Sequence, residues 1–510
     1  MGGLINMREL LDLPTQRRLK IIEQLNEMSD WISSNELAQK NNASLRTINN
    51  DVSYLKDNWY PHLLIETSKK NGVRLKTLPS SHIRLVYSHV LKNSDAFRLL
   101  DAIFFDTTKS IEKWGETLFI SESSLYRIIN DLSTSLNHFD LTLEKKPCRI
   151  VGQSELTVRF FFTSFFREAY SITDWPFPTN REKIITFALS ILDTLNLSCD
   201  ENQVMKLANL INISLIRIKQ GFYNDSHTYN SELTEQYANV LLKNKIPLEE
   251  IVNDLELTCD ENLLNDLIHS IFYYRHNWTS DSEKVTVIKA IRHLIKTLRD
   301  IFDLTLSNLV ADQIEDYLKY LYLYHKVYPY RNFIIFDHYY HGGTTIKENL
   351  PFFDDVVAKL LLRMERETHF PWYSHYRYVV LYGLMIKWEN LSELLEEKKL
   401  KAKVLVMSDL GKDHRDFLIK TIQKNFYNKV TLYGYDDLVI FLNQTSIDQF
   451  NDYDLIITNF NTILLPVNKL LVIDDVPSNQ DWANIRHAVN KFFTLSPRMT
   501  ADIQIFEEDQ

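Results

Sequence analysis

The sequence predicts a mainly α, multidomain protein that ends in a small α/β domain. Three observations lead to this fold class. The chain has 510 residues, which is more than one hydrophobic core usually serves. Its 11 glycines and 13 prolines are few for that length, which favours long helices over turn-rich β folds. Apolar residues recur at helical spacing through most of the chain, and strand-like runs alternate regularly with helical segments only in residues 399–510.

Residues 1–79 have the element order of a winged helix-turn-helix domain. The apolar stripe that predicts the first helix is Leu19, Ile22, Leu25 and Met28. A short helix capped by Ser33 or Ser34 follows, and then a polar break. Ser44 caps a longer helix. The inward stripe of that helix is Leu45, Ile48, Val52 and Leu55. Two short strands joined by a turn at Asn71 and Gly72 form the wing.

The outer side of the longer helix carries residues suited to DNA. In the major groove Arg pairs with guanine and Asn with adenine, while cations on a wing neutralise phosphates. The candidate DNA contacts of this domain are Ser44, Arg46, Thr47, Asn49, Asn50, Lys69, Lys70, Arg74 and Lys76. Asp51 is a poor DNA contact, so we expect it to bond locally or to lie away from phosphate.

Residues 80–153 repeat this unit. The segment SSLYRIINDLSTSL matches ASLRTINNDVSYL at an offset of 80, after an apolar helix at 95–105 and a short helix at 109–118. A second basic hairpin follows. The candidate DNA contacts of this domain are Ser123, Ser124, Tyr126, Arg127, Asn130, Lys145, Lys146 and Arg149. Two such units in tandem are more specific for DNA binding than one. The alternatives are winged helices that dock proteins and, for the second unit, a purely packing role.

The charge distribution agrees with an interaction surface at the N-terminal end. The net charge is −10, but residues 1–80 hold 11 Lys and Arg against 9 Asp and Glu, and residues 81–152 hold 9 against 9. The acidity therefore belongs to residues 153–510. Total charge alone argues against a protein that coats nucleic acid, whereas its partition does not.

The middle of the chain is helical in pattern and divides near Asp281 into blocks 154–281 and 282–398, which we expect to be two helical bundles. In residues 399–510, strands at 403–408, 429–434, 453–459 and 469–474 alternate with helices and predict a parallel sheet. One of these helices is DLVIFLNQ, at 437–444.

Several classes of site are not expected. The three cysteines form no CxxC pair, which predicts neither a disulfide framework nor a cysteine zinc site and fits a reducing cytoplasm. We expect no secretory signal and no membrane span. The loop SDLGKDHR has neither phosphate-binding glycine motif, and we expect no cofactor, no metal and no enzymatic activity.

With NNASLRTINNDVSYLKDN, SKKNGVRLK and SESSLYRIINDLSTSLNHF as its most specific parts, the chain resembles the Mga/AtxA family. These are virulence-type transcriptional regulators of Gram-positive bacteria. The resemblance covers nearly the whole chain. It implies that the two helical blocks are phosphotransferase-system regulation domains and that residues 399–510 form a domain like the EIIB component of that system. It also implies binding to double-stranded promoter DNA and a homodimer, formed through the last domain.

The resemblance also implies phosphorylation of histidines by phosphocarrier proteins. The histidine position in the first helix motif of related antiterminators falls on Leu210, so that site is lost. His269 suits the second position in the first regulation domain, His375 suits it in the second, and His325 is a third candidate. The loop 408–414 lacks the EIIB cysteine.

Two further hypotheses stay open beside that of a DNA-binding regulator. One is a phosphotransferase-linked carrier without direct DNA binding, in which His414, His269 or His375 passes phosphate. The other is a scaffold whose winged helices bind protein.

Overall fold

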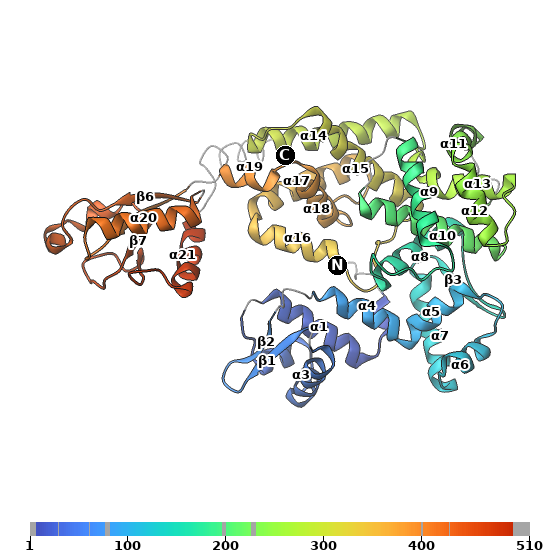
Figure 1. The fold of residues 1–510 in the computed structure, drawn as a ribbon, viewed down its shortest axis with the longest axis horizontal. Coiled ribbons are helices and arrows are strands. Elements are labelled where there is room, and N and C mark those ends of the chain that lie inside the picture. The colour runs from blue at the N-terminus through green and yellow to red at the C-terminus, as the bar shows by residue number, and fades with distance from the viewer. Residues whose placement is uncertain are drawn as a thin grey trace. The chain divides into compact units, whose positions relative to one another are not determined.

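A computed structural model describes residues 7–28, 30–60, 62–76, 82–195, 200–225, 231–398, 401–427 and 429–492. The chain divides into two compact units, and Figure 1 shows its helices and strands coloured by residue number. The first unit comprises Met1–Glu283 with Lys319–His341, and the second comprises Lys284–Leu318 with Gly342–Gln510. Within the described residues, no helix is long and apolar enough to cross a membrane.

The first winged helix follows the predicted order. Its elements are η1 (Met7–Leu10), α1 (Leu13–Glu27), α2 (Ser34–Lys40), α3 (Leu45–Trp59), β1 (Leu64–Ser68) and β2 (Gly72–Lys76). The side chains of Ser33 and Ser44 cap α2 and α3 by accepting from the backbone N–H of Glu36 and Thr47. Ile32 pairs with Val73 as a third, single-residue strand of the wing.

The second winged helix has the same parts. They are α5 (Asp95–Phe105), α6 (Ile111–Leu118), α7 (Glu122–Asn137), β3 (Leu141–Lys145) and β4 (Cys148–Gly152). The N–H of Cys148 donates to the carbonyl of Lys109 at 2.8 Å, in the place of the Ile32–Val73 pair. Helix α4 (Arg84–Asn93) precedes α5 and was missing from the sequence prediction.

Two of the predicted core positions of the first domain are wrong. Met28 is 42% exposed because α1 ends at Glu27, and Leu45 is 44% exposed because it is the first residue of α3. The inner side of α3 instead contains Asp51 and Trp59, which are buried.

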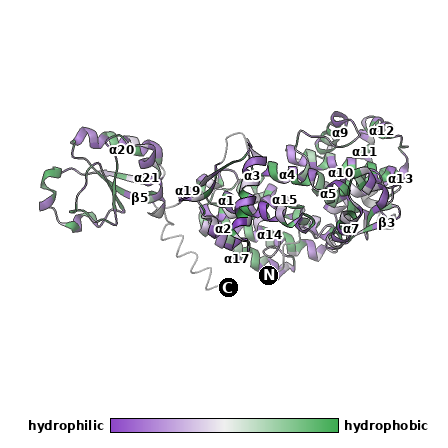
Figure 2. Cartoon of the chain, turned by 90° about the horizontal axis from the view of Figure 1, so that it is seen from below, coloured by the Kyte–Doolittle hydropathy of each residue, from purple (hydrophilic) through white to green (hydrophobic). Residues whose placement is uncertain are grey.

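The first helical block continues the core of the winged helices. Its elements are α8 (Glu155–Ala169), α9 (Arg181–Thr194), α10 (Glu201–Lys219), α11 (Ser231–Lys243), α12 (Lys245–Asp254), α13 (Glu261–Phe272) and η3 (Tyr273–Arg275). Every side chain of α8 from Leu156 to Phe166 is buried. One hydrophobic cluster joins both winged helices to α8, and apolar residues alternate with polar ones along the surrounding helices (Figure 2).

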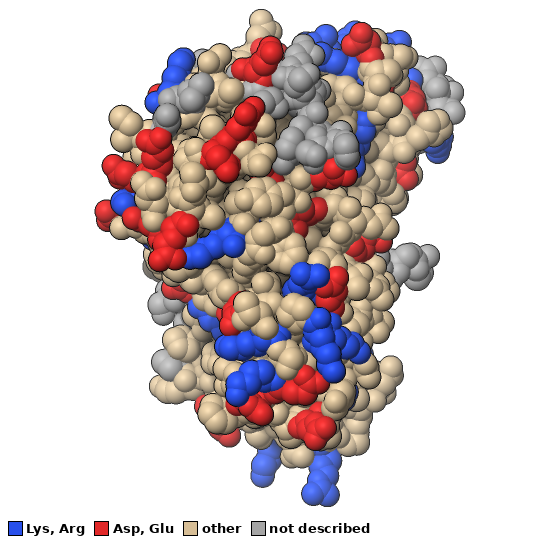
Figure 3. Space-filling view, turned by 90° about the vertical axis from the view of Figure 1, so that its right-hand side faces the viewer, with Lys and Arg blue, Asp and Glu red and all other residues tan. Residues whose placement is uncertain are grey.

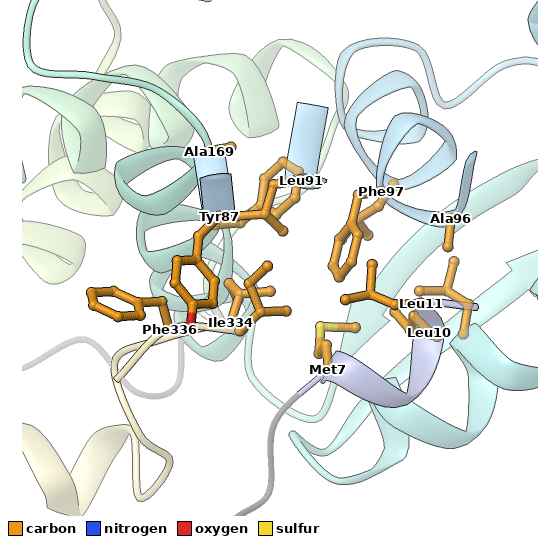
Figure 4. Packing of buried hydrophobic residues seen from close by; sticks show 14 of the residues in the cluster. Met7, Leu10, Leu11, Tyr87, Leu91, Ala96, Phe97, Ala169, Ile334 and Phe336 are labelled. Carbon is orange, nitrogen blue, oxygen red and sulfur yellow. The ribbon is translucent and has the colours of Figure 1, made fainter. Parts of the chain in front are cut away.

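The segment 333–336 ties distant parts of the first unit together. The N–H of Met7 donates to the carbonyl of Ile334 at 2.9 Å, and the Glu168 carboxylate accepts from the N–H groups of residues 334, 335 and 336. Tyr87 and Phe336 lie with their rings 4.4 Å apart, and Figure 4 shows both beside Ile334. Burial raises the pKa of Glu168 to about 7, against the effect of the three N–H bonds.

Of the six helices of the second block, the first three have residues in both units and the last three belong to the second unit. They are α14 (Asp281–Phe302), α15 (Asn308–Val327), α16 (His338–Asn349), α17 (Pro351–Thr368), α18 (Arg377–Lys387) and α19 (Leu391–Glu397). Within the second unit, Trp372 and Trp388 are fully buried. The division of the chain into five domains stays a prediction.

The predicted parallel sheet is present in the C-terminal part. The strands β5 (Ala402–Met407), β6 (Val430–Gly434), β7 (Leu455–Thr458) and β8 (Leu470–Val472) lie in the order β6-β5-β7-β8, all parallel. Helices α20 (Lys412–Phe426) and α21 (Asn479–Phe492) share one hydrophobic cluster with alternate strand residues. The helix predicted at 437–444 is wrong in type: only 3-10 turns occur there, η4 (Val439–Gln444) and η5 (Ile447–Phe450).

Candidate nucleic-acid interface

The two helices that would enter the major groove correspond at an offset of 77 residues, not 80. Their N-caps are Ser44 and Ser121. The buried positions of α3 are Ile48, Asp51, Val52, Leu55 and Trp59, and those of α7 at the same spacing are Leu125, Ile128, Ile129, Leu132 and Leu136. The offset of 80 is therefore wrong by three residues. Three residues are close to one helical turn, so both registers place apolar residues on the same face.

This register changes which residues are equivalent. The counterparts of Arg46, Thr47, Asn49 and Asn50 are Ser123, Ser124, Tyr126 and Arg127. Asn130 corresponds to Ser53, further from the N-terminus of the helix, where side chains reach bases less readily. The candidate set of the second domain therefore stays nearly the same, although the identities that suggested it do not describe equivalent positions.

The predicted base contacts lie on the exposed side of each helix. Arg46, Asn49 and Asn50 are exposed on α3, and Ser123, Tyr126, Arg127 and Asn130 are exposed on α7. Ser44 and Thr47 serve the helix start, because Ser44 Oγ accepts from the Thr47 N–H and lies 2.8 Å from its Oγ1. The geometry thus combines a capped helix end with free donors and acceptors beside it.

Phe119 is an exposed residue that the sequence interpretation missed. It lies in the turn between α6 and α7 with a φ of 58° and is 94% exposed. The corresponding turn of the first domain has Asn42 with a φ of 48°. Its neighbour Ile120 is 8% exposed, so the apolar pair Phe119-Ile120 before the polar run SES does not tell from the sequence alone which of the two faces solvent.

The lysines of both wings are exposed to solvent, unlike the wing arginines. Lys69, Lys70 and Lys76 on the first wing and Lys145 and Lys146 on the second are exposed. On the face shown in Figure 3, Lys and Arg gather over the lower part, where Figure 1 places the winged helices, and alternate with Asp and Glu.

The wing arginines are held within their own hairpins. Arg74 bonds Glu66 across the β1–β2 pair at 2.5 Å and lies over the Trp31 ring at 4.7 Å. Arg149 bonds Glu144 across the β3–β4 pair in the same way and lies 5.7 Å from the centre of the Phe222 ring. An arginine that already has a carboxylate contributes less net charge toward phosphate than a free lysine.

A buried polar network connects the second wing to the first helical block. Arg217 donates to both oxygens of Glu155 at 2.7 Å and to the carbonyl of Ile150 in β4 at 3.1 Å. Arg159, fully buried, donates to the same Glu155 and to Asp266 of α13. Removing one member of such a network leaves a buried charge without its partner, so the members hold one another in place.

His269, a phosphorylation candidate, lies next to this network. It follows Asp266 by three residues on α13, is 7% exposed and stacks on Tyr273 with ring centres 4.3 Å apart. Burial lowers the pKa of His269 to about 4. The other two candidates differ: His325 is half-buried on α15 with its pKa also lowered to about 4 by burial, and His375 is half-buried before α18 beside Tyr376. Leu210 is buried in the core.

The loop after β5 has a serine–histidine pair where EIIB proteins place a cysteine. Ser408 Oγ lies 2.7 Å from His414 Nδ1, and His414 Nε2 lies 2.7 Å from the carbonyl oxygen of Asp475. A carbonyl oxygen can only accept a hydrogen bond, so Nε2 of His414 donates to Asp475, and in the neutral imidazole Nδ1 accepts from the Ser408 hydroxyl. Both ring nitrogens of His414 are thus hydrogen-bonded within the domain.

Two winged helices with exposed groove-reading faces, on a helical body, define a DNA-binding regulator. Comparisons with known proteins agree. A family model described as the Mga helix-turn-helix domain matches residues 79–166, and one described as an HTH domain matches residues 17–74. The chain is a DNA-binding transcriptional regulator, and it is similar to trans-acting regulators of the Mga/AtxA type.

Three relatives show the extent of the likeness. A trans-acting regulator of Streptococcus pneumoniae serotype 4 is 27% identical over 498 residues, which cover 91% of this chain and 95% of the relative. The anthrax toxin expression trans-acting positive regulator of Bacillus anthracis is 22% identical, over 93% of this chain and 98% of its own length. The capsule synthesis positive regulator AcpA of the same organism is 29% identical, over 40% of this chain and 42% of its own length.

Proposed function

We propose that the chain binds promoter DNA in the cytoplasm with both winged helices at once and activates transcription. The observation that carries this proposal is that α3 and α7 repeat the same cap, the same buried spacing and the same exposed face. The Bacillus relatives are named positive regulators, which supports activation. Base reading falls to Arg46, Asn49 and Asn50 in the first domain and to Tyr126 and Arg127 in the second. The wing lysines bind phosphates.

Fluorescence anisotropy with labelled promoter DNA tests this proposal. The Lys69→Ala/Lys70→Ala double variant removes two exposed wing cations, so we expect weaker binding and a slope of log K against log salt that is smaller by about two. Lys420→Ala removes an exposed cation from α20 and serves as the control. Unchanged affinity and slope in the double variant, together with unchanged binding by Arg46→Ala, would remove the first domain from the mechanism.

We propose that phosphorylation of His269 by a phosphocarrier protein tunes DNA binding. A phosphoryl group adds negative charge next to Asp266 and competes with that carboxylate for Arg159. Through Glu155 the change reaches Arg217, whose guanidinium holds the carbonyl of Ile150 in the second wing. Because His269 is buried, transfer requires α13 to open locally.

Labelled phosphoenolpyruvate with the general phosphotransferase proteins tests the modification. We expect His269→Ala to lose the label and His325→Ala and His375→Ala to keep it. Label that disappears with His375→Ala instead would move the site to the second block. Stable label in a protein that binds no DNA would favour a phosphocarrier.

We propose that the chain forms a homodimer through its C-terminal part. This part exposes many apolar side chains, which a second copy would cover. They include Leu438 at 63%, Ile440 at 76%, Ile447 at 58%, Ile463 at 95% and Val467 at 79% exposed. Sedimentation velocity of the full chain should show a dimer that Ile463→Asp with Val467→Asp dissociates. Ile246→Asp, at an equally exposed site on α12, should leave it intact.

A further inference from the structure

A cavity of about 260 Å³ lies where the second winged helix meets the first helical block. Helices α4, α5, α6 and α8 each contribute to its lining. Its apolar wall consists of Leu91, Phe97, Ala102, Leu118, Phe165 and Ala169. Figure 4 shows Leu91, Phe97 and Ala169 among the packed side chains. A cavity of about 150 Å³ already admits benzene, so this one has room for a ligand of one ring and a short substituent.

Asp101 is the polar group that distinguishes this cavity. Its Oδ1 accepts the hydroxyl hydrogen of Tyr170 at 3.2 Å, and its Oδ2 has no hydrogen-bond partner among the described residues. The carboxylate is partly buried, and burial raises the pKa of Asp101 to about 6. A carboxylate held in such a place without a cation favours a ligand that brings one.

The cations at the rim are already paired. Lys92 bonds Asp174 at 2.7 Å, and Arg98 bonds Asp95 at 3.2 Å. Each rim cation is therefore offset by a neighbouring acid, and among the described residues neither forms an ion pair with Asp101. The rim thus offers no net positive charge to a ligand anion, whereas the interior offers an acceptor to a ligand cation.

We propose that this cavity binds a small organic ammonium ion, with its N–H donating to Asp101 Oδ2 and its apolar body packed on the partly exposed Ala102 and Leu118. The proposal is independent of DNA binding, because it concerns occupancy of the cavity alone. The cavity joins α5, the first helix of the second winged helix, to α8, the first helix of the helical block. A ligand there would contact both elements.

Isothermal titration calorimetry of the full chain at pH 7.5 tests the proposal with benzylamine as the probe. Benzyl alcohol and benzoate have the same ring with a neutral and an anionic head. We expect saturable binding of benzylamine only. Asp101→Asn keeps the hydrogen-bond acceptor for Tyr170 but removes the charge, so the affinity for benzylamine should fall at least about tenfold. Glu116→Gln, an exposed acid on α6, should bind benzylamine like the original chain.

A second variant guards against misfolding. Ala102→Leu fills part of the cavity and leaves residue 101 unchanged. It should also lower the affinity for benzylamine, with the circular dichroism spectrum unchanged. The proposal is overturned if benzyl alcohol binds as well as benzylamine, if Asp101→Asn binds benzylamine unchanged, or if no probe binds.

Discussion

Arg18 Nε lies 2.9 Å from Asp51 Oδ1, and this bond joins the first helix of the N-terminal winged helix to its recognition helix. Arg17 Nε donates to the other oxygen at 2.5 Å, and the carboxylate is almost fully buried. The corresponding position in the second domain is Ile128, which is buried in the hydrophobic core. The same helix pair is thus fixed by an ionic contact in one copy and by apolar packing in the other.

Asp51→Asn should lower the stability of the first winged helix by about 2 kcal/mol, because two guanidinium groups lose their shared carboxylate. Urea denaturation followed by tryptophan fluorescence measures the loss. Asp131→Asn is the control, since Asp131 is exposed on α7 and should change stability by less than about 0.5 kcal/mol. Equal effects of the two substitutions would contradict the register of 77.

The register also predicts which residues of α7 read DNA. Arg127→Ala removes the counterpart of Asn50 and should weaken specific binding by about 1–3 kcal/mol. Asn130→Ala, further along the helix, should have a much smaller effect. Gel shifts with specific and random competitor DNA measure the effect of each substitution on specific binding. A larger loss for Asn130→Ala would restore the offset of 80.

Gly72→Ala should destabilise the first wing strongly. Its φ is +102°, and an added Cβ would lie 2.1 Å from the carbonyl oxygen of Ile32, the strand partner of Val73. Gly221→Ala is a matched control, because its φ is +85° but no atom lies within 4 Å of the added Cβ. Thermal denaturation should show a cost of about 1 kcal/mol at position 221 and clearly more at position 72.

Asp101→Asn should change stability in a pH-dependent way. Burial raises the folded-state pKa of Asp101 from 3.8 to about 6, so the folded chain holds the proton more tightly than the unfolded chain. The stabilising contribution of protonated Asp101 is complete below about pH 4 and is lost as the pH rises through 6. The free energy of unfolding of the asparagine variant should therefore equal that of the original chain at pH 4 and be higher at pH 8 by on the order of 1–2 kcal/mol. Melting curves at both pH values decide this, and a variant that is less stable at pH 8 would contradict it.

Asp266→Ala should be among the most damaging substitutions in the first helical block. It leaves Arg159, which is 0% exposed, without a main partner and should cost about 3–5 kcal/mol. Asp95→Ala breaks the exposed pair with Arg98 and should cost less than about 0.5 kcal/mol. The difference in denaturation midpoint between the two variants is the readout. Similar midpoints would show that the buried network does not stabilise the fold by more than an exposed ion pair.

The sequence by itself determined the elements and their order. Caps such as Ser33 and Ser44, apolar stripes at helical spacing and the alternation of strands with helices are local signals, and they predicted both winged helices and the parallel C-terminal sheet. Local signals failed where a segment is short or its pattern is shared. The six residues of η4 have an apolar run that suits either helix type, and helix α4 follows a stretch without a cap.

Only the tertiary structure decided the register of the repeat and the partners of the charged residues. A shift of three residues keeps an apolar stripe on the same face, so periodicity cannot separate an offset of 77 from one of 80, whereas burial can. The contacts of Arg18 with Asp51 and of Arg159 with Asp266 span 33 and 107 residues, and Asp101 faces Tyr170 across 69. Tertiary packing brings these residues together. Which charged residues pair depends on which helices pack against each other, and the sequence around each charge does not contain that information.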